Sequence, residues 1–259
     1  MEQVTGYVAF LDVLGFTDLI ARDERLDVVG RYVRAVKAAV PTARVTNGLR
    51  MVLFSDSIII STKGDDPDAL PPLLEACSRV FGALLGLEVP VRGAIAYGRF
   101  IRSVPGEGAA IVAGRPIIEA LQWEREQDWV GISLAPSVLR RISGLEERCA
   151  SRTIGSESDL DDLSNRLPWV AHLLMYSHIP FHAESPSEPH TVVGFAVIPL
   201  DPTMRTVEDI VPGCDRLTDH AMRMLLLGPD PRCQQSASGS RSSWATLRAS
   251  GTISCVATS

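Results

Sequence analysis

The chain has 259 residues with 46% hydrophobic and 22% charged side chains, which is ordinary for a globular protein and excludes wholesale disorder. Its 25 basic and 31 acidic residues give a formal charge of −6, so we expect neither nucleic acid nor an anionic membrane as a partner. No apolar run is long enough to cross a bilayer, and the first residues do not resemble a signal peptide, so we expect a cytoplasmic protein. The five cysteines are scattered, so we expect free thiols.

The first third of the chain predicts alternating strands and helices. Residues 7–13 are apolar and β-branched, as in a central strand, and apolar residues at helical spacing predict a helix over 26–40. Residues 49–54 and 57–61 are short strand-like runs joined by a Ser-Asp turn, which predicts a hairpin. A second helical pattern covers 68–85.

The following residues continue the alternation. Strands are predicted at 91–100, 109–113 and 129–134, with a helix over 116–127 between the last two. Two helices crossing one face of a mainly antiparallel sheet predict an α+β, ferredoxin-like fold.

The remainder of the chain has weaker patterns. A helix is expected at 168–176 and a strand at 191–200. We expect one domain over residues 1–228, in which 135–228 elaborate the core. The Ser- and Gly-rich composition beyond it predicts a loosely ordered tail over 229–259.

Two carboxylates stand where packing favours apolar side chains. Asp12 lies inside the strand 7–13, and Asp56 lies at the tip of the predicted hairpin. A carboxylate buried alone costs several kcal/mol, so each must be paired or hold a cation. If the strands are neighbours, both carboxylates emerge at one sheet edge, and such a pair suits Mg²⁺ or Mn²⁺. The alternative is that Asp12 caps the next turn and Asp56 is a turn residue.

Several motifs on this frame resemble those of class III nucleotidyl cyclases. Residues 10–17 read F-L-D-V-L-G-F-T, like the D-x-x-G-F-T opening of that family, and residues 55–57 stand where it has Gly-Asp. Residues 92–98 keep the spacing of its R-x-G-x-x-x-G strand, and Gly114 begins a segment like its dimer-facing helix. The agreement covers 7–134, and the wording most resembles the Pycsar pyrimidine cyclases of bacterial anti-phage defence.

The resemblance implies that a nucleoside triphosphate is converted into a 3′,5′-cyclic nucleotide and pyrophosphate with two Mn²⁺ or Mg²⁺ ions. The metals would be held by the Asp12 and Asp56 carboxylates and the Val13 carbonyl, and the phosphates by backbone N–H groups of Leu14, Gly15, Phe16 and Thr17. Sites of this family lie between two subunits, so a homodimer is implied. The product would be a second messenger read by a separate effector during phage infection.

The chain also departs from the family pattern. Its transition-state Asn and Arg positions fall on Ile118 and Gln122, so another cation must stabilise the transition state. Arg92 and Arg99 are the candidates we favour over Arg115. The alternative for Arg92 is that it is an ordinary cation at a strand end. A non-catalytic nucleotide-binding or dimerisation module is therefore a second hypothesis.

The base-reading position of the family's purine enzymes falls near Val52, which offers no hydrogen bond. Arg50 lies two residues away and thus on the same strand face. Because an Arg only donates, it suits the carbonyl oxygens of uracil or cytosine, and uracil has two of them. We therefore expect UTP in preference to CTP, with an ATP or GTP cyclase as the alternative.

Overall fold

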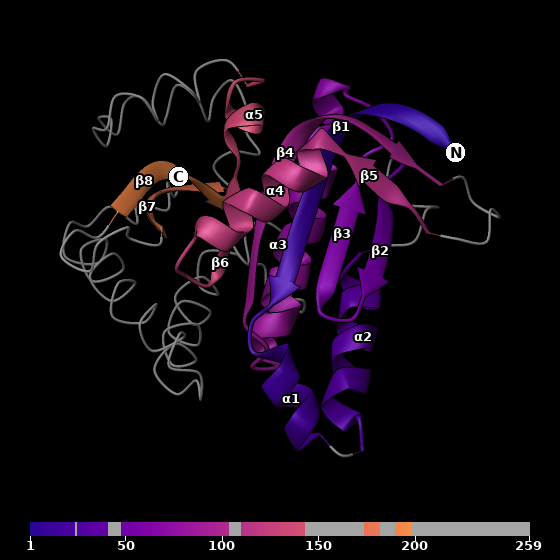
Figure 1. Cartoon of the computed structure of the whole chain (residues 1–259), viewed down its shortest axis with the longest axis vertical. Helices are drawn as coiled ribbons and strands as arrows, with labels where there is room; N and C mark the ends of the chain where they lie inside the picture. The colour runs from indigo at the N-terminus through magenta and orange to yellow at the C-terminus, as the bar shows by residue number, and fades with distance from the viewer. Residues whose placement is uncertain (24, 41–47, 104–109, 143–173, 182–189, 198–259) are drawn as a thin grey trace, which may run out of the picture.

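The structure is a computed structural model that describes residues 1–23, 25–40, 48–103, 110–142, 174–181 and 190–197 (Figure 1). The predicted tail 229–259 and most of the elaboration 135–228 lie outside these residues. The strands are β1 (Glu2–Val13), β2 (Arg50–Phe54), β3 (Ser57–Ser61), β4 (Val91–Arg102), β5 (Val112–Gly114), β6 (Gly131–Leu134), β7 (Leu174–Phe181) and β8 (His190–Val197). The helices are α1 (Phe16–Arg22), α2 (Asp27–Ala39), α3 (Leu70–Gly86), α4 (Arg115–Glu126) and α5 (Pro136–Leu139), with a 3₁₀ turn at Pro67–Ala69.

The elements expected between residues 7 and 134 are confirmed within a few residues, with β1 starting earlier and an extra short helix, α1, before α2. The helix expected at 168–176 is wrong for its last three residues, which begin β7. A short apolar run has the same composition in a buried strand and in a buried helix, so periodicity does not separate the two.

The strands form one mixed sheet in the order β2-β3-β1-β4-β6-β8-β7, with β5 paired to β4. The β4–β6 pair is parallel, and every other pair among the described strands is antiparallel. The succession β1-α2-β2-β3-α3-β4 is the β-α-β-β-α-β unit of ferredoxin-like folds. The α+β, antiparallel-dominated fold class is therefore confirmed.

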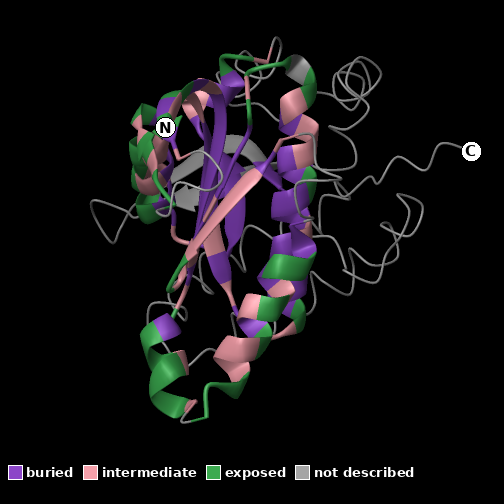
Figure 2. Cartoon of the chain, turned by 90° about the vertical axis from the view of Figure 1, so that its right-hand side faces the viewer, coloured by how far each residue is buried: buried purple, intermediate pink, exposed green. Residues whose placement is uncertain are grey.

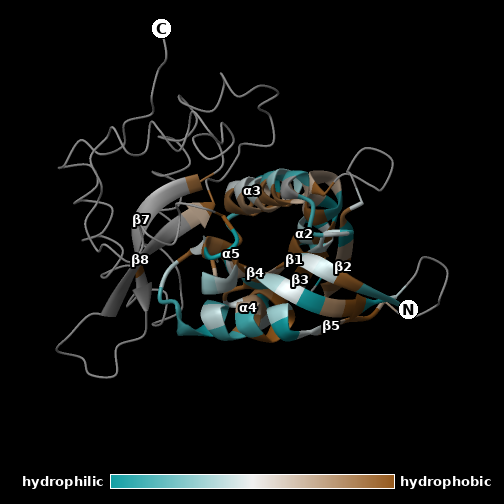
Figure 3. Cartoon of the chain, turned by 90° about the horizontal axis from the view of Figure 1, so that it is seen from above, coloured by the Kyte–Doolittle hydropathy of each residue, from teal (hydrophilic) through white to brown (hydrophobic). Residues whose placement is uncertain are grey.

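The sequence predicted helices on one face of this sheet, but α2 and α3 cover one face and α4 covers the other, as the view along it shows (Figure 3). On one face Leu11 of β1 belongs to the large core that α2 and α3 complete. On the other face its neighbour Phe10 packs with Ala120 of α4. The central strands are accordingly buried, whereas α1 is largely exposed (Figure 2). None of the described helices is both long and apolar enough to cross a membrane.

Candidate functional site

A row of register partners crosses the sheet where β1 ends. Ser57 of β3 is paired with Phe54 of β2 on one side and with Asp12 of β1 on the other, and Asp12 is paired in turn with Arg92 of β4. Directly opposed residues project from the same side of a sheet. These four residues, called here the Asp12 row, therefore lie on the face that carries α4, since Phe10 two positions earlier packs against that helix.

The hairpin between β2 and β3 brings Asp56 to the end of this row. Its turn consists of Ser55 and Asp56, and Ser55 has a φ of 56°, a left-handed conformation that glycine adopts most easily. The N–H of Val13 donates to the backbone oxygen of Asp56 at 3.1 Å, which ties the hairpin to the end of β1. The two carboxylates singled out in the sequence thus come from adjacent segments at one edge of the sheet.

Asp12 is half-buried and has few partners. The Ser57 hydroxyl donates to its Oδ1 at 3.2 Å, and no ion pair joins Asp12 to any cation in the part of the chain that the structure describes. Burial, followed by the negative charges of Glu124 and Asp56, raises the pKa of Asp12 from 3.8 to about 6, although Ser57 and Arg92 oppose the shift. No side chain caps α1, so the capping alternative does not account for Asp12.

These donors fit a hard divalent cation. Within the described residues, no group of three or more His, Cys, Asp or Glu side chains converges, so a closed zinc-type site is not formed there. Two carboxylates with the neighbouring Val13 carbonyl match Mg²⁺ or Mn²⁺, which keep waters and take further oxygens from phosphates. The chemistry of the donor set therefore agrees with the metal that the sequence predicts.

The turn between β1 and α1 supplies part of the expected phosphate contacts. The N–H of Leu14 donates to the Pro90 carbonyl at 2.9 Å, so the expectation that Leu14 holds a phosphate has to be corrected. Gly15 adopts a left-handed conformation with a φ of 71°, and α1 begins at the next residue. The N–H groups of Phe16 and Thr17 lie in the first turn of a helix, where no intrahelical carbonyl accepts from them. Gly15, Phe16 and Thr17 remain the candidates.

Arg92 is held by the end of α4. Its Nε donates to Oε1 of Glu124 at 2.6 Å, and its Nη1 donates to the carbonyl oxygen of Gln127 at 2.7 Å. The side chain of Glu124 is only 2% exposed and that of Arg92 is 17% exposed. This placement agrees with a structural cation near the row, and a direct catalytic role for Arg92 stays a prediction.

The hydrogen-bond network around Glu124 was not predicted from the sequence. The Gln127 side chain donates to the carbonyl oxygens of Gly93 and Trp123 at 3.3 and 2.8 Å, and it accepts from Trp129 Nε1 at 2.6 Å. A signal was present, because Glu124 continues the buried i, i+4 stripe of Pro116 and Ala120 along α4. A carboxylate in the apolar stripe of a helix requires a buried partner.

Arg99 lies far from the row in the same subunit. It is exposed, and its register partner is Thr5, near the opposite end of β1 from Asp12. The seven residues that separate it from Arg92 correspond to about 23 Å along β4. Because an odd number of positions separates it from Arg92, it also projects from the opposite face of the sheet, so the structure does not bring Arg99 to this site within one subunit.

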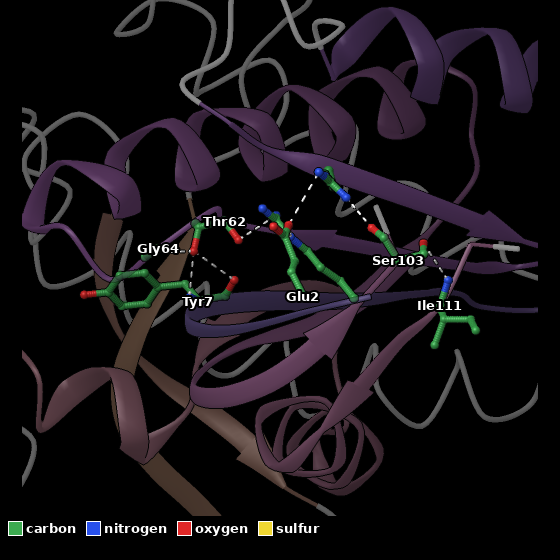
Figure 4. Close-up of polar contacts among 8 residues, drawn as sticks. Glu2, Tyr7, Thr62, Gly64, Ser103 and Ile111 are labelled. Carbon is green, nitrogen blue, oxygen red and sulfur yellow. Dashed lines mark hydrogen bonds and ion pairs between the residues drawn. The ribbon is translucent and has the colours of Figure 1, made fainter. Parts of the chain in front are cut away.

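Arg50 lies on the same face of the sheet as the Asp12 row but at a distance from it. It lies four residues before Phe54, which is about 13 Å along β2. Its Nη2 is 3.4 Å from Oε1 of Glu2, and its Nη1 donates to the Ser103 carbonyl (Figure 4). The side chain is 28% exposed, so it is oriented by partners but still reaches solvent.

An exposed apolar surface, which includes Phe54 of the row, lies between Arg50 and Asp12. We call it the ledge, and it consists of the α4-side residues Val52 and Phe54 of β2 and Ile59 of β3. Helix α4 packs mainly on β4 and β1, which leaves Phe54 79% exposed. The ledge thus has the two carboxylates near one end and the Arg50 guanidinium at the other.

Comparisons with known proteins give structural neighbours only. No protein-family model and no curated protein match the chain. Among solved structures, the catalytic core of a rhodopsin-guanylyl cyclase with converted specificity, in complex with ATPαS, is 12% identical over 77% of this chain and 98% of its own, with a TM-score of 0.47. The adenylyl cyclase CyaB from P. aeruginosa is 12% identical over 79% and 100%, with a TM-score of 0.44. A class III adenylyl cyclase-like ATP-binding protein from Pseudomonas aeruginosa is 14% identical over 64% and 40%, with a TM-score of 0.43.

Proposed function

We propose that the protein is a nucleotidyl cyclase that converts a nucleoside triphosphate into a 3′,5′-cyclic nucleotide and pyrophosphate. The observation that carries this proposal is the pair Asp12 and Asp56 at one sheet edge. Asp12 is half-buried and makes no ion pair with the described residues, although it faces an arginine. Such a carboxylate is stabilised by a cation that it binds.

Different residues bind the metal ions, orient the metal-binding carboxylate and bind the phosphates. Asp12, Asp56 and the Val13 carbonyl hold the divalent cations, which when bound lower the pKa of the ribose 3′-hydroxyl and neutralise the departing pyrophosphate. Ser57 fixes the orientation of the Asp12 carboxylate through its 3.2 Å hydrogen bond. The N–H groups of Gly15, Phe16 and Thr17 bind phosphate oxygens. The 3′-oxygen then attacks the α-phosphorus, the bond to the pyrophosphate oxygen breaks, and the hydroxyl proton passes to solvent.

The finer proposal is a UTP cyclase, with CTP as the second pyrimidine substrate. Arg50 supports it because its guanidinium, oriented by Glu2 and the Ser103 carbonyl, can only donate and therefore matches the carbonyl-rich edge of uracil. The proposed homodimer would cover the ledge, and Arg99, which projects from the opposite face of the sheet, stays a candidate only for the site of a second copy. A role as source of a second messenger in phage defence rests on the motif resemblance alone.

A specific observation favours the second candidate, a domain that binds a nucleotide without turning it over. Ile118 is 57% exposed on α4, and Gln122 is also exposed, at the positions where the resemblance predicts Asn and Arg. An apolar side chain and a neutral amide cannot stabilise the charge that develops on the phosphates.

The deciding experiment is incubation of the purified protein with each of the four triphosphates and Mn²⁺ or Mg²⁺, followed by chromatography and mass spectrometry of the products. We expect a cyclic pyrimidine nucleotide from the wild type. Asp12→Ala and Asp56→Ala should each abolish turnover while the protein stays folded. Asp68→Ala, an exposed carboxylate near α3, is the matched control that should keep full activity. Substantial activity in either site variant would contradict the metal assignment, and nucleotide binding without product would favour the second candidate.

A further inference from the structure

Arg92 forms its ion pair with Glu124 of α4 and not with its register partner Asp12. It stands directly opposite Asp12 in the β1–β4 register, on the same face of the sheet. Opposite charges at such a pair of positions normally attract each other across the strands. Here the guanidinium points instead to α4, where it pairs with Glu124 at 2.6 Å, and no ion pair joins Arg92 to Asp12.

Two acceptors at the end of α4 stabilise the position of the Arg92 guanidinium. Glu124 is 2% exposed, so its ion pair with Arg92 is shielded from water, and charge-assisted hydrogen bonds of this kind are the strong ones. The second acceptor is the Gln127 carbonyl at the end of α4, where the helix dipole favours a cation. Gln127 is itself anchored, because its side chain bonds to Gly93, Trp123 and Trp129.

We infer that Glu124 is a positioning residue that holds Arg92 away from Asp12 and so leaves that carboxylate available to a divalent cation. This inference rests on the proposed function, since it concerns the metal carboxylate of that same site. Without the Glu124 charge, the long Arg92 stem can turn along the sheet to its register partner. The Arg92 charge then occupies the oxygens that the metal needs, and the cation has to displace an internal ion pair.

The test is Mn²⁺ binding, measured by electron paramagnetic resonance and calorimetry in the absence of nucleotide, so that turnover is not the readout. We expect Glu124→Gln to weaken Mn²⁺ binding about tenfold or more, the equivalent of one charge-assisted hydrogen bond. Adding Arg92→Met to that variant removes the competing cation, and we expect binding to return to within a few-fold of the wild type. Glu119→Gln, on the same helix, is the matched control and should bind Mn²⁺ normally.

The rescue separates positioning from mere structural support. If Glu124 only stabilised the fold, the double variant would bind Mn²⁺ as weakly as Glu124→Gln, and that result would overturn the inference. Wild-type affinity in Glu124→Gln would overturn it as well. Should Glu124→Gln not fold, Glu124→Asp keeps the charge on a shorter stem. We then expect a smaller weakening that Arg92→Met also reverses, and a loss without reversal contradicts the inference.

Asp12→Asn distinguishes this inference from the function on which it rests. If the wild type binds Mn²⁺ and Asp12→Asn does not, the metal site stands, and only the Glu124 variants decide about positioning. If the wild type does not bind Mn²⁺, or Asp12→Asn binds it equally well, the proposed site itself is contradicted and the inference falls with it.

Discussion

At the scale of single residues, the site depends on how Asp12 is solvated. Its carboxylate keeps one hydrogen bond, from Ser57, and lies near two further acidic side chains, Asp56 and Glu124. Burial and these like charges disfavour the ionised form, so the free protein stores unfavourable electrostatic energy at this position. A divalent cation bound at the proposed site would relieve this cost, because its positive charge favours the ionised carboxylate.

This electrostatic cost predicts a pH-dependent effect of Asp12→Asn. The folded protein raises the pKa of Asp12 to about 6, so it binds this proton more tightly than the unfolded chain does. The stability that protonation supplies is present at pH values below about 4 and is lost as the pH rises through 6. In thermal denaturation with a chelator, Asp12→Asn should therefore melt above the wild type at pH 8, and the gap should shrink towards pH 4. A gap independent of pH would contradict the assignment.

Arg50→Ala tests the proposal that Arg50 contacts the nucleotide base. Losing one charge-assisted hydrogen bond costs about 1.5–3 kcal/mol, so kcat/KM with UTP should fall roughly tenfold or more. The preference for UTP over CTP should become smaller. Arg79→Ala is the control, because Arg79 forms an exposed ion pair with Glu75 on α3, away from the ledge. Steady-state kinetics with all four triphosphates measure the effect, and an unchanged selectivity profile would remove Arg50 from the base pocket.

At the scale of elements, the β1–β4 pair positions the site. It sets Asp12 opposite Arg92, and it is continuous from Glu2↔Arg102 to Val13↔Val91. Gly93, next to Arg92, permits the close approach of the two strands, since a Cβ there would lie 2.5 Å from Leu11 Cδ2 and 2.7 Å from the Phe10 oxygen. A methyl group at this position must push the strands apart or displace core atoms.

Gly93→Ala should consequently destabilise the protein by about 1–3 kcal/mol, the usual cost of overpacking. Gly86→Ala is the matched control, because a Cβ at that helical position meets no atom within 4 Å. It should be neutral or stabilise by about 0.4–1 kcal/mol. Urea denaturation measures both changes, and equal stabilities of the two variants would show that β1 and β4 are not packed at this distance.

At the scale of the whole molecule, the layers leave the ledge open. One face of the sheet is covered by α2 and α3, whereas α4 on the other face packs mainly on β4 and β1 (Figure 3). An exposed aromatic side chain such as Phe54 suits a contact with a second copy, and the proposed function includes such a homodimer. The open ledge is consistent with such a dimer.

Phe54→Asp tests this arrangement. The wild type should sediment as a dimer, and Phe54→Asp should sediment as a monomer because a charge then faces the apolar partner surface. Its melting temperature as a monomer should change little, since Phe54 is 79% exposed. Ile20→Asp is the control, because Ile20 is an exposed apolar residue of α1 outside the ledge. A dimeric Phe54→Asp protein would show that the ledge is not the contact.

Much of the fold between residues 7 and 134 follows from the sequence alone. Strands and helices there differ in hydrophobic period, and that period is a local property of each segment. The carboxylates Asp12 and Asp56 could be recognised for the same reason, because each interrupts an apolar pattern. The order of elements then predicted the β-α-β-β-α-β unit, whereas the common edge of the two carboxylates followed only if their strands were neighbours, as the register of β1 and β3 shows them to be.

Only the tertiary structure decided which polar groups are already engaged. Arg92 is paired with Glu124, 32 residues away, and the Leu14 N–H is taken by Pro90. Arg99 lies at the opposite end of the sheet from Asp12, and residues 174–176 extend as a strand beside β8. These outcomes depend on register and on contacts between distant segments. A side chain's partner is set by where the strands and helices meet in space, whereas the sequence pattern records only which side of its own element it occupies.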